Sequence, residues 1–230
     1  MSVYDRTIAL LGEDNQNKLK NSSVIVFGVG GVGGYVVEAL ARVGVGSITI
    51  VDSDVIVESN INRQIIALRS NVGKDKVEEI KKRILDINSD IKVESIKMLY
   101  LPQRADEIDL LKYDMVVDCI DNITAKIDLA VRCKNLGVSL ISSMGAGNRT
   151  DATLFKVDDI YNTKNCALSK VMRRELRKRN IEKLKVVYST EEKIKQENVT
   201  DRKELGSLVT CVAVCGMLIA GEVIKDLLVK

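Results

Sequence analysis

Three glycines, Gly28, Gly30 and Gly33, follow a run of β-branched residues with the spacing G-x-G-x-x-G. Glycines at this spacing let a backbone turn approach phosphate oxygens at the amino end of a helix. Asp52 ends the next apolar run about twenty residues later, where a carboxylate can accept the hydroxyl protons of a ribose. The pattern predicts nucleotide binding. NAD is the usual ligand of this motif, and a Rossmann-like fold that binds nothing is the alternative.

A second group of polar residues changes the kind of nucleotide that we expect. Arg63 and Lys76 bring two cations close to the glycine loop, which suits a triphosphate better than the diphosphate of NAD. Asp121, in the segment DCIDN, follows a central strand where open α/β sheets bind ligands, and a carboxylate beside phosphates commonly holds Mg2+. The alternatives are a solvated salt-bridge cluster for the cations and a helix N-cap for Asp121. We expect ATP and Mg2+ at a site that also contains Asp54, Asn60 and Gln64.

The composition narrows the possible chemistry. The chain contains no histidine, which excludes imidazole bases, His-ligated metals and Ser-His-Asp triads. Its five cysteines form no CxxC pair, and an odd number of scattered cysteines is typical of reduced thiols in a cytosolic protein. The apolar run 208–221 is shorter than the roughly 20 residues of a membrane span, and the polar N-terminal segment lacks the pattern of a signal peptide. We expect a cytoplasmic protein without membrane association.

These residues must be positioned by alternating strands and helices, which predict a Rossmann-like α/β fold with a doubly wound, mostly parallel sheet. An N-terminal helical arm precedes this sheet, and a C-terminal α+β extension follows it. We treat residues 1–230 as one domain with a nucleotide-binding part, 1–150, and a closing part, 151–230, and we expect a mobile loop over 190–206. The expected strands are 24–28, 47–52, 91–96, 115–120, 138–145, 153–157 and 184–189, and the expected helices are 31–43, 74–87, 124–135, 166–179 and 208–228.

Positive charge is concentrated in the closing part. Between Lys164 and Lys185, nine Lys and Arg residues stand against two Glu, a local charge of +7 in a chain whose net charge is +3. Clustered cations of this kind are typical of surfaces that bind phosphate backbones, and the alternative is an ordinary solvated face. At 100° per residue, one helix face carries the apolar residues Leu168, Val171, Met172 and Leu176. The opposite face carries the residues that we expect to contact a polyanion: Lys170, Arg173, Arg174, Arg177 and Lys178.

The segments DSDVIVESNINRQ, VGKDKVEEIKKRILDIN and DCIDN resemble the nucleotide-binding segments of the ubiquitin-activating-enzyme-like superfamily. The resemblance covers about residues 1–145 and implies an enzyme that activates carboxylates by adenylation. It also implies a homodimer, because Arg6, in YDRTIALLG, matches an arm arginine that reaches the ATP site of the partner subunit. The implied roles are a phosphate loop for Gly28, Gly30 and Gly33, ribose binding for Asp52, phosphate binding for Asn60, Arg63, Gln64 and Lys76, and Mg2+ binding for Asp121.

The C-terminal third, from SSMGAGNRTDATLFKVDDIY onward, resembles the branch of tRNA threonylcarbamoyladenosine dehydratases. The resemblance implies ATP-dependent cyclisation of N6-threonylcarbamoyladenosine beside the tRNA anticodon, through adenylation of the threonyl carboxylate. Two departures from the superfamily are the missing zinc-binding cysteine pairs and Ala167, which follows Cys166 where many relatives have proline. The alternative is an adenylating enzyme for a ubiquitin-like sulfur carrier, with Cys166 as the residue that forms a thioester. The sequence leaves open a monovalent cation, Na+ or K+, and a sulfur-transfer partner.

Overall fold

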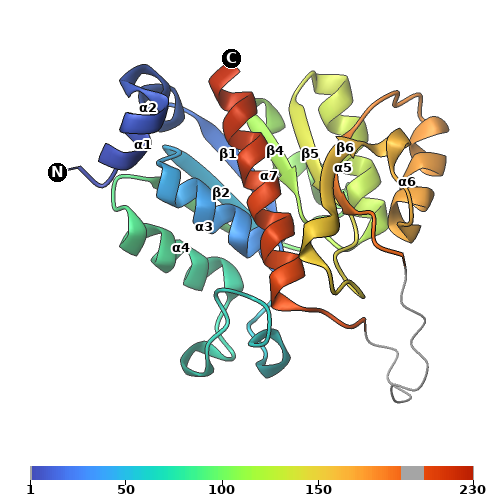
Figure 1. The fold of residues 1–230 in the computed structure, drawn as a ribbon, viewed down its shortest axis with the longest axis horizontal. Coiled ribbons are helices and arrows are strands. Elements are labelled where there is room, and N and C mark those ends of the chain that lie inside the picture. The colour runs from blue at the N-terminus through green and yellow to red at the C-terminus, as the bar shows by residue number, and fades with distance from the viewer. Residues whose placement is uncertain (1, 193–204, 230) are drawn as a thin grey trace.

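The computed structural model describes residues 2–192 and 205–229, which form an α/β fold around one seven-stranded sheet (Figure 1). The strand order is β3-β2-β1-β4-β5-β7-β6, and every pairing between these strands is parallel except that of β6 with β7. The chain turns to opposite sides of β1 to form β2 and β4, as in a doubly wound sheet. The strands are β1 (Ser23–Phe27), β2 (Ser47–Asp52), β3 (Lys92–Lys97), β4 (Met115–Asp118), β5 (Ser139–Ser143), β6 (Phe155–Asp159) and β7 (Lys185–Ser189).

Helices connect and cover these strands. The α-helices are α1 (Asp5–Leu11), α2 (Glu13–Lys20), α3 (Gly33–Val43), α4 (Lys76–Ile87), α5 (Ile123–Leu136), α6 (Ala167–Arg177) and α7 (Val209–Val229). The short 3-10 helices are η1 (Glu58–Asn60), η2 (Arg69–Asn71), η3 (Pro102–Glu107), η4 (Leu110–Lys112), η5 (Ala152–Leu154) and η6 (Ile160–Asn162).

Successive residues of the central strands point to opposite faces of the sheet, and both faces are buried. In β1, Val24 and Val26 join the apolar cluster that includes residues of α3, α4 and α7, whereas Ile25 and Phe27 join the cluster that includes residues of α5. A strand that is buried on both faces needs apolar residues at every position, which explains the run VIVF. Figure 1 shows α3, α4 and α7 in front of the sheet, with α6 at its far edge.

The closing helix α7 lies beside α3 and forms a large part of the front layer. Its residues Val212 and Ile219 belong to the same apolar cluster as Val36 and Leu40 of α3. Gly216 allows the close approach, because a Cβ atom there would lie 2.5 Å from the carbonyl oxygen of Val32. The last helix in the sequence therefore covers the helix that follows the glycine loop.

The structure confirms the predicted fold class, with small differences at the ends of the elements. The C-terminal extension is continuous with the rest of the sheet, because Ile141 of β5 pairs with Lys185 of β7. The functional division at residue 150 stays a prediction. Residues 193–204 of the predicted mobile loop lie outside the described residues. Within residues 2–192 and 205–229, no helix has the length and hydropathy that a membrane span requires.

Candidate active site

Most of the predicted residues meet in a cavity of about 580 Å³ at the carboxyl ends of the parallel strands β1 to β5. Its walls come from the segments that follow these strands, near the bottom of Figure 1, and from Leu168 of α6, Val212 of α7 and Leu205, which precedes α7. Neither Gly33 nor Arg6 is among the described residues that line it. The predicted residues that do line it are Gly28, Gly30, Asp52, Asp54, Asn60, Arg63, Gln64, Lys76 and Asp121.

The structure gives a different explanation for the presence of glycine at each of the three positions in the loop. Gly28 has a φ of 80°, and a Cβ atom there would lie 2.8 Å from the carbonyl oxygen of Cys119. A Cβ atom on Gly33 would lie 1.9 Å from the carbonyl oxygen of Gly28, so Gly33 allows α3 to pack closely on the loop. Its role in the phosphate loop stays a prediction. At Gly30 the nearest atom is the Gln64 amide nitrogen at 3.6 Å, an ordinary contact. The protein therefore leaves room for a Cβ atom at Gly30.

Two carboxylates after β2 organise the loops beside the glycines. Asp52 Oδ2 accepts a hydrogen bond from the backbone N–H of Val29 at 2.8 Å, and Oδ1 accepts one from Asp54 at 2.9 Å. Lys76, the first residue of α4, is buried with 5% of its side chain exposed, and its ammonium group lies 2.7 Å from Asp54 Oδ2. Asp54 itself is 62% exposed. Lys76 is thus already buried, whereas its partner Asp54 is free to move into solvent. A phosphate could therefore replace Asp54 as the counter-ion of Lys76.

The segment around η1 contributes three polar side chains. Asn60 Oδ1 accepts a hydrogen bond from the backbone of Val57 at 3.2 Å, which closes the turn. Arg63 is half-buried, and its Nη1 donates to the carbonyl oxygen of Ser59 at 2.8 Å. Gln64 is only 7% exposed, and its Oε1 is buried without a hydrogen-bond partner. A buried polar atom without a partner costs free energy, so the cavity has an amide group that a bound ligand would satisfy.

Asp121 lies in the turn between β4 and α5, where it is exposed and lines the cavity. The alternative that Asp121 caps the helix is wrong, because Asn122 is the N-cap of α5 and its Oδ1 accepts from the backbone of Ala125 at 3.0 Å. The cap is therefore provided by its neighbour, and the Asp121 carboxylate faces the same cavity as Arg63 and Lys76.

The sequence interpretation missed a buried ion pair beneath this site. Lys126 and Asp118 each have 1% of their side chains exposed, and Lys126 Nζ lies 2.9 Å from Asp118 Oδ2. Lys126 also lines the cavity. A signal was present, because Lys126 precedes Leu129, Ala130 and Cys133 by three, four and seven residues, and all three are buried. Helical periodicity thus places Lys126 on the inward face of α5.

Arg6 is exposed on α1, remote from the cavity of its own chain. Tyr4, at the start of α1, hydrogen-bonds to Asn88 after the end of α4, and its ring lies beside Gly44 after the end of α3. Both helices begin near the cavity, so α1 packs against their opposite ends. The 11 residues of α3 alone span about 16 Å. Any contribution of Arg6 to such a site must therefore come from a second subunit.

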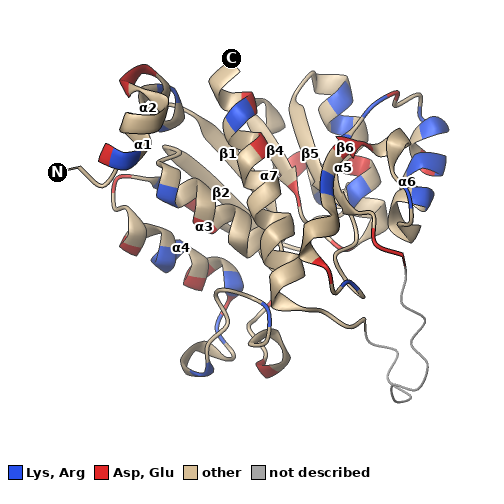
Figure 2. Ribbon diagram, in the orientation of Figure 1, with Lys and Arg blue, Asp and Glu red and all other residues tan. Residues whose placement is uncertain are grey.

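Figure 2 shows several Lys and Arg residues along α6, and the predicted cations of this helix are exposed with one exception. Arg173 is half-buried, and its Nη1 donates to the carbonyl oxygen of Thr163 at 3.0 Å and to the Thr163 hydroxyl. The structure thus gives Arg173 a role in attaching α6 to the preceding segment, which its position on the helical wheel did not reveal. Glu175 accepts from Arg174, Lys178 and Arg179. The remaining predicted cations, which are exposed, are Lys170, Arg174, Arg177 and Lys178.

The five cysteines are free thiols. Burial raises the pKa of Cys133 and of Cys215 to about 12, and burial also raises the pKa of Cys119 well above its ordinary value. Cys166 is 7% exposed, and its Sγ accepts from the backbone of Ser169 at 3.5 Å as the N-cap of α6. The raised pKa values favour the protonated form of Cys119, Cys133 and Cys215 over a nucleophilic thiolate, and burial makes Cys166 inaccessible.

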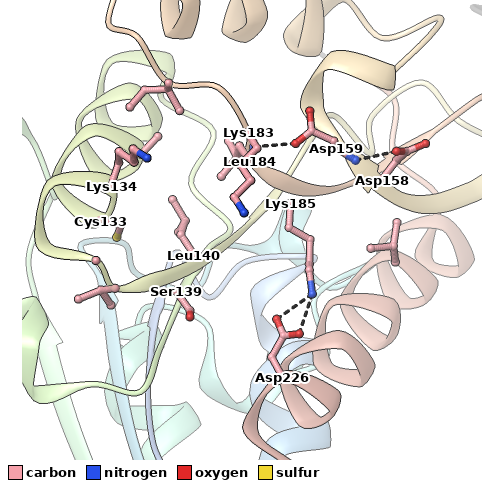
Figure 3. Close-up of a pocket in the computed structure, with 15 residues that line it drawn as sticks. Cys133, Lys134, Ser139, Leu140, Asp158, Asp159, Lys183, Leu184, Lys185 and Asp226 are labelled. Atoms are coloured by element: carbon pink, nitrogen blue, oxygen red, sulfur yellow. Dashed lines mark hydrogen bonds and ion pairs between the residues drawn. The ribbon is translucent and has the colours of Figure 1, made fainter. Parts of the chain in front are cut away.

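A second cavity, of about 670 Å³, lies at the opposite end of the sheet, near the start of β5 and β7 (Figure 3). Its carboxylates serve the fold: Asp226 pairs with Lys185 at 2.7 Å, and Asp159 Oδ2 accepts from the backbone of Leu184 at 3.0 Å. It is larger than the first cavity, but it contains neither the glycine loop nor the ends of the parallel strands. We therefore assign the chemistry to the smaller cavity.

A Rossmann-like sheet with these motifs at its carboxyl end places the chain in a class of nucleotide-binding proteins, and the chain belongs to the ThiF family, whose model matches residues 4–230. The tRNA threonylcarbamoyladenosine dehydratase of Bacillus subtilis is 40% identical to it over 98% of this chain and 94% of the relative. The structure of the Escherichia coli dehydratase TcdA in complex with ATP matches with a TM-score of 0.90 and 29% identity, over 98% of this chain and 93% of that chain. The molybdopterin-synthase adenylyltransferase of Haemophilus influenzae is 29% identical over 96% of this chain and 82% of the relative.

Proposed function

We propose that this protein uses ATP to dehydrate N6-threonylcarbamoyladenosine in tRNA, closing the side chain into a ring through adenylation of its threonyl carboxylate. The observation that carries the proposal is the cavity at the glycine loop, where Gly30 is open to a ligand, Gln64 Oε1 lacks a partner and Lys76 is buried. The similarity to dehydratases over nearly the full length of both chains supports the choice of substrate.

The cavity fits ATP as a substrate together with Mg2+. The glycine loop presents backbone to phosphates, Asp52 stands at the end of β2 where a ribose would lie, and Arg63 and Lys76 supply charge. Among the described residues, no group of three or more acidic or thiol side chains could hold a metal. Asp121 would therefore hold Mg2+ together with phosphate oxygens and water, the usual environment of this ion. Bound there, Mg2+ would offset phosphate charge.

A carboxylate oxygen is a poor leaving group, and adenylation replaces it with a good one. One carboxylate oxygen attacks the α-phosphorus of ATP, and pyrophosphate leaves. The carbamoyl group of the same side chain then attacks the activated carbonyl carbon, loses a proton and expels AMP. The AMP keeps one oxygen of the carboxylate, so the nucleoside has lost the elements of water. Arg63 and Lys76 would stabilise charge that develops on the phosphates, a contribution worth about 10²- to 10³-fold in rate for each donor.

The tRNA would bind along α6. Leu168, in the first turn of this helix, lines the cavity, so the cationic face of α6 begins beside the site of reaction. An RNA whose phosphates contact Lys170 and Arg174 would therefore bring a nearby nucleotide to the cavity mouth. The free thiols of all five cysteines are consistent with the reducing cytoplasm, where we place the protein.

We further propose a homodimer in which Arg6 of one subunit completes the cavity of the other. The exposed position of Arg6 on α1, at the end of α3 remote from its own glycine loop, supports this arrangement. An arginine at that point would add a cation to the phosphate site, where Arg63 and Lys76 already lie.

The alternative, activation of a ubiquitin-like sulfur carrier through a thioester on Cys166, has less support. A thioester requires an accessible thiolate, whereas Cys166 is 7% exposed and its Sγ caps α6. The same cavity could still adenylate a protein carboxylate, so the substrate must be tested directly.

The test is to incubate the protein with ATP, Mg2+ and tRNA that carries threonylcarbamoyladenosine. We expect pyrophosphate release and a product nucleoside that is lighter by one water, measured by mass spectrometry. Asp121→Asn is the matched inactive control, because it removes a carboxylate charge with little change in volume. If the nucleoside mass stays constant while a ubiquitin-like carrier protein becomes adenylated, the tRNA assignment is wrong.

A further inference from the structure

The buried ion pair below the cavity joins three elements of the fold. Lys126 Nζ donates to Asp118 Oδ2 at 2.9 Å, to Ser142 Oγ at 3.3 Å and to the carbonyl oxygen of Ser143 at 2.7 Å. An ammonium group has three hydrogens, so each of them has an acceptor. Asp118 ends β4, the two serines end β5, and Lys126 lies in the first turn of α5. The pair therefore connects the carboxyl ends of two neighbouring strands.

Both segments that the pair holds continue into walls of the cavity. Asp118 Oδ1 accepts from the backbone of Ile120 at 3.0 Å, which shapes the turn that carries Asp121. Ser143, whose carbonyl oxygen accepts from Lys126, is followed by residues 144–147, and these also line the cavity. The pairing of Asp118 with Ser142 in the two strands and the hydrogen bond from Ser142 Oγ to Asp118 Oδ2 join the same segments. Lys126 adds to them the contact with the Ser143 carbonyl oxygen, from which this part of the wall continues.

Stability alone does not explain a charged pair in this position. A buried ion pair loses most of its Coulomb attraction to desolvation, and well-packed apolar side chains of similar size are often as stable or more stable. Among the ion pairs of residues 2–192 and 205–229, this is the one whose two side chains are both almost fully buried. This ion pair also lies beside the candidate active site, since Lys126 lines the cavity.

We propose that Lys126 is a positioning residue, which acts through Asp118 and Ser143 to set the Asp121 carboxylate relative to the cavity wall formed by residues 144–147. The inference rests on the proposed function, in which Asp121 holds Mg2+ beside the phosphates of ATP. Lys126 itself has no hydrogen left for substrate, so its effect is on geometry. A displacement of about 1 Å at a reacting centre can cost about 10²-fold in rate.

The test compares Lys126→Met with wild type in two measurements, thermal stabilisation by ATP with and without Mg2+, and the rate of pyrophosphate release. ATP alone should stabilise both proteins equally, because the glycine loop is unchanged. The additional stabilisation by Mg2+ should be lost in the variant, and kcat should fall about 10²-fold with little change in KM for ATP. Lys185→Met, at the ion pair of the second cavity (Figure 3), is the control and should keep both properties.

If Lys126→Met does not fold, the double variant Lys126→Met with Asp118→Leu replaces the pair by apolar side chains and is measured in the same way. The proposal is overturned if either folded variant keeps the Mg2+ increment and the wild-type kcat. Failure of the proposed function would appear differently, because wild type itself would then release no pyrophosphate with the modified tRNA, while the Mg2+ increment would still report on the role of Lys126.

Discussion

Alanine at Gly30 and alanine at Gly33 should have opposite effects on stability and on ATP binding. A Cβ atom at position 33 would lie 1.9 Å from a backbone oxygen of Gly28, and such overpacking costs about 1–3 kcal/mol or more. For a chain of this size, that loss lowers Tm by about 2–12 °C. At position 30 the nearest protein atom is 3.6 Å from the new Cβ, so Gly30→Ala should keep a Tm close to that of wild type. Its methyl group would occupy the space that a phosphate needs.

The assay is thermal unfolding with and without ATP at about 100 times the wild-type dissociation constant. Ligand at that concentration stabilises the native state by about 2.7 kcal/mol, which corresponds to a Tm increase of about 5–11 °C for wild type. Gly30→Ala should show almost none of this increase. Gly221→Ala is the control, because no atom lies within 4 Å of a Cβ at this position in α7, and it should be neutral or slightly stabilising. A full ATP response in Gly30→Ala, or a Gly33→Ala protein as stable as the control, would refute the reasoning.

Three further predictions concern charge. Glu175→Gln should tighten tRNA binding up to about fivefold in a filter-binding assay, because it leaves three neighbouring cations without their counter-ion. Hydrogen bonds from Lys178 and Arg179 hold the pKa of Glu175 at about 2, so Glu175 is ionised at both pH 5 and pH 8 and the gain in affinity should be the same. A gain that disappears at pH 5 would contradict this. Arg173→Ala should lower Tm while leaving the salt dependence of tRNA binding unchanged, and a shallower log-log slope would show that Arg173 does contact phosphate. Arg6→Ala and Asp121→Asn should each be inactive alone, but re-annealed mixtures should recover up to about a quarter of the sites, and verified heterodimers without activity would exclude a contribution across subunits.

The features that sequence predicted well are those with a local cause. The spacing of the glycines, the β-branched run before them and Asp52 at the end of the next strand all belong to one continuous segment, and the structure places Gly28, Gly30 and Asp52 in one cavity. The carboxyl ends of parallel strands meet at one edge of a sheet, so Asp121 could be placed there from the order of elements alone. Gly33 was located correctly, but its contact with the Gly28 carbonyl depends on the angle at which α3 leaves the loop.

The features that sequence did not predict depend on contacts between distant segments. Arg173 shares a helical face with exposed cations, yet Thr163 in the preceding segment accepts its guanidinium hydrogens. Lys126 follows the periodicity of buried residues, but lysine is rarely buried unless it is paired with a buried carboxylate, here that of Asp118. Lys76 was expected to face phosphates, and the structure adds Asp54 as its counter-ion. Each of these partners comes from another element of the fold.

The packing of α7 against α3 also has a consequence for protein synthesis. A ribosome makes α3 well before α7, and domains generally fold as they emerge from the N-terminal side. Until α7 is complete, Val36 and Leu40 lack the helix that covers them in the finished protein, and Val212 is missing from the wall of the cavity. A nascent chain that stops before Val209 therefore lacks one residue of the cavity wall, and it exposes an apolar helix face to chaperones and to other unfinished chains.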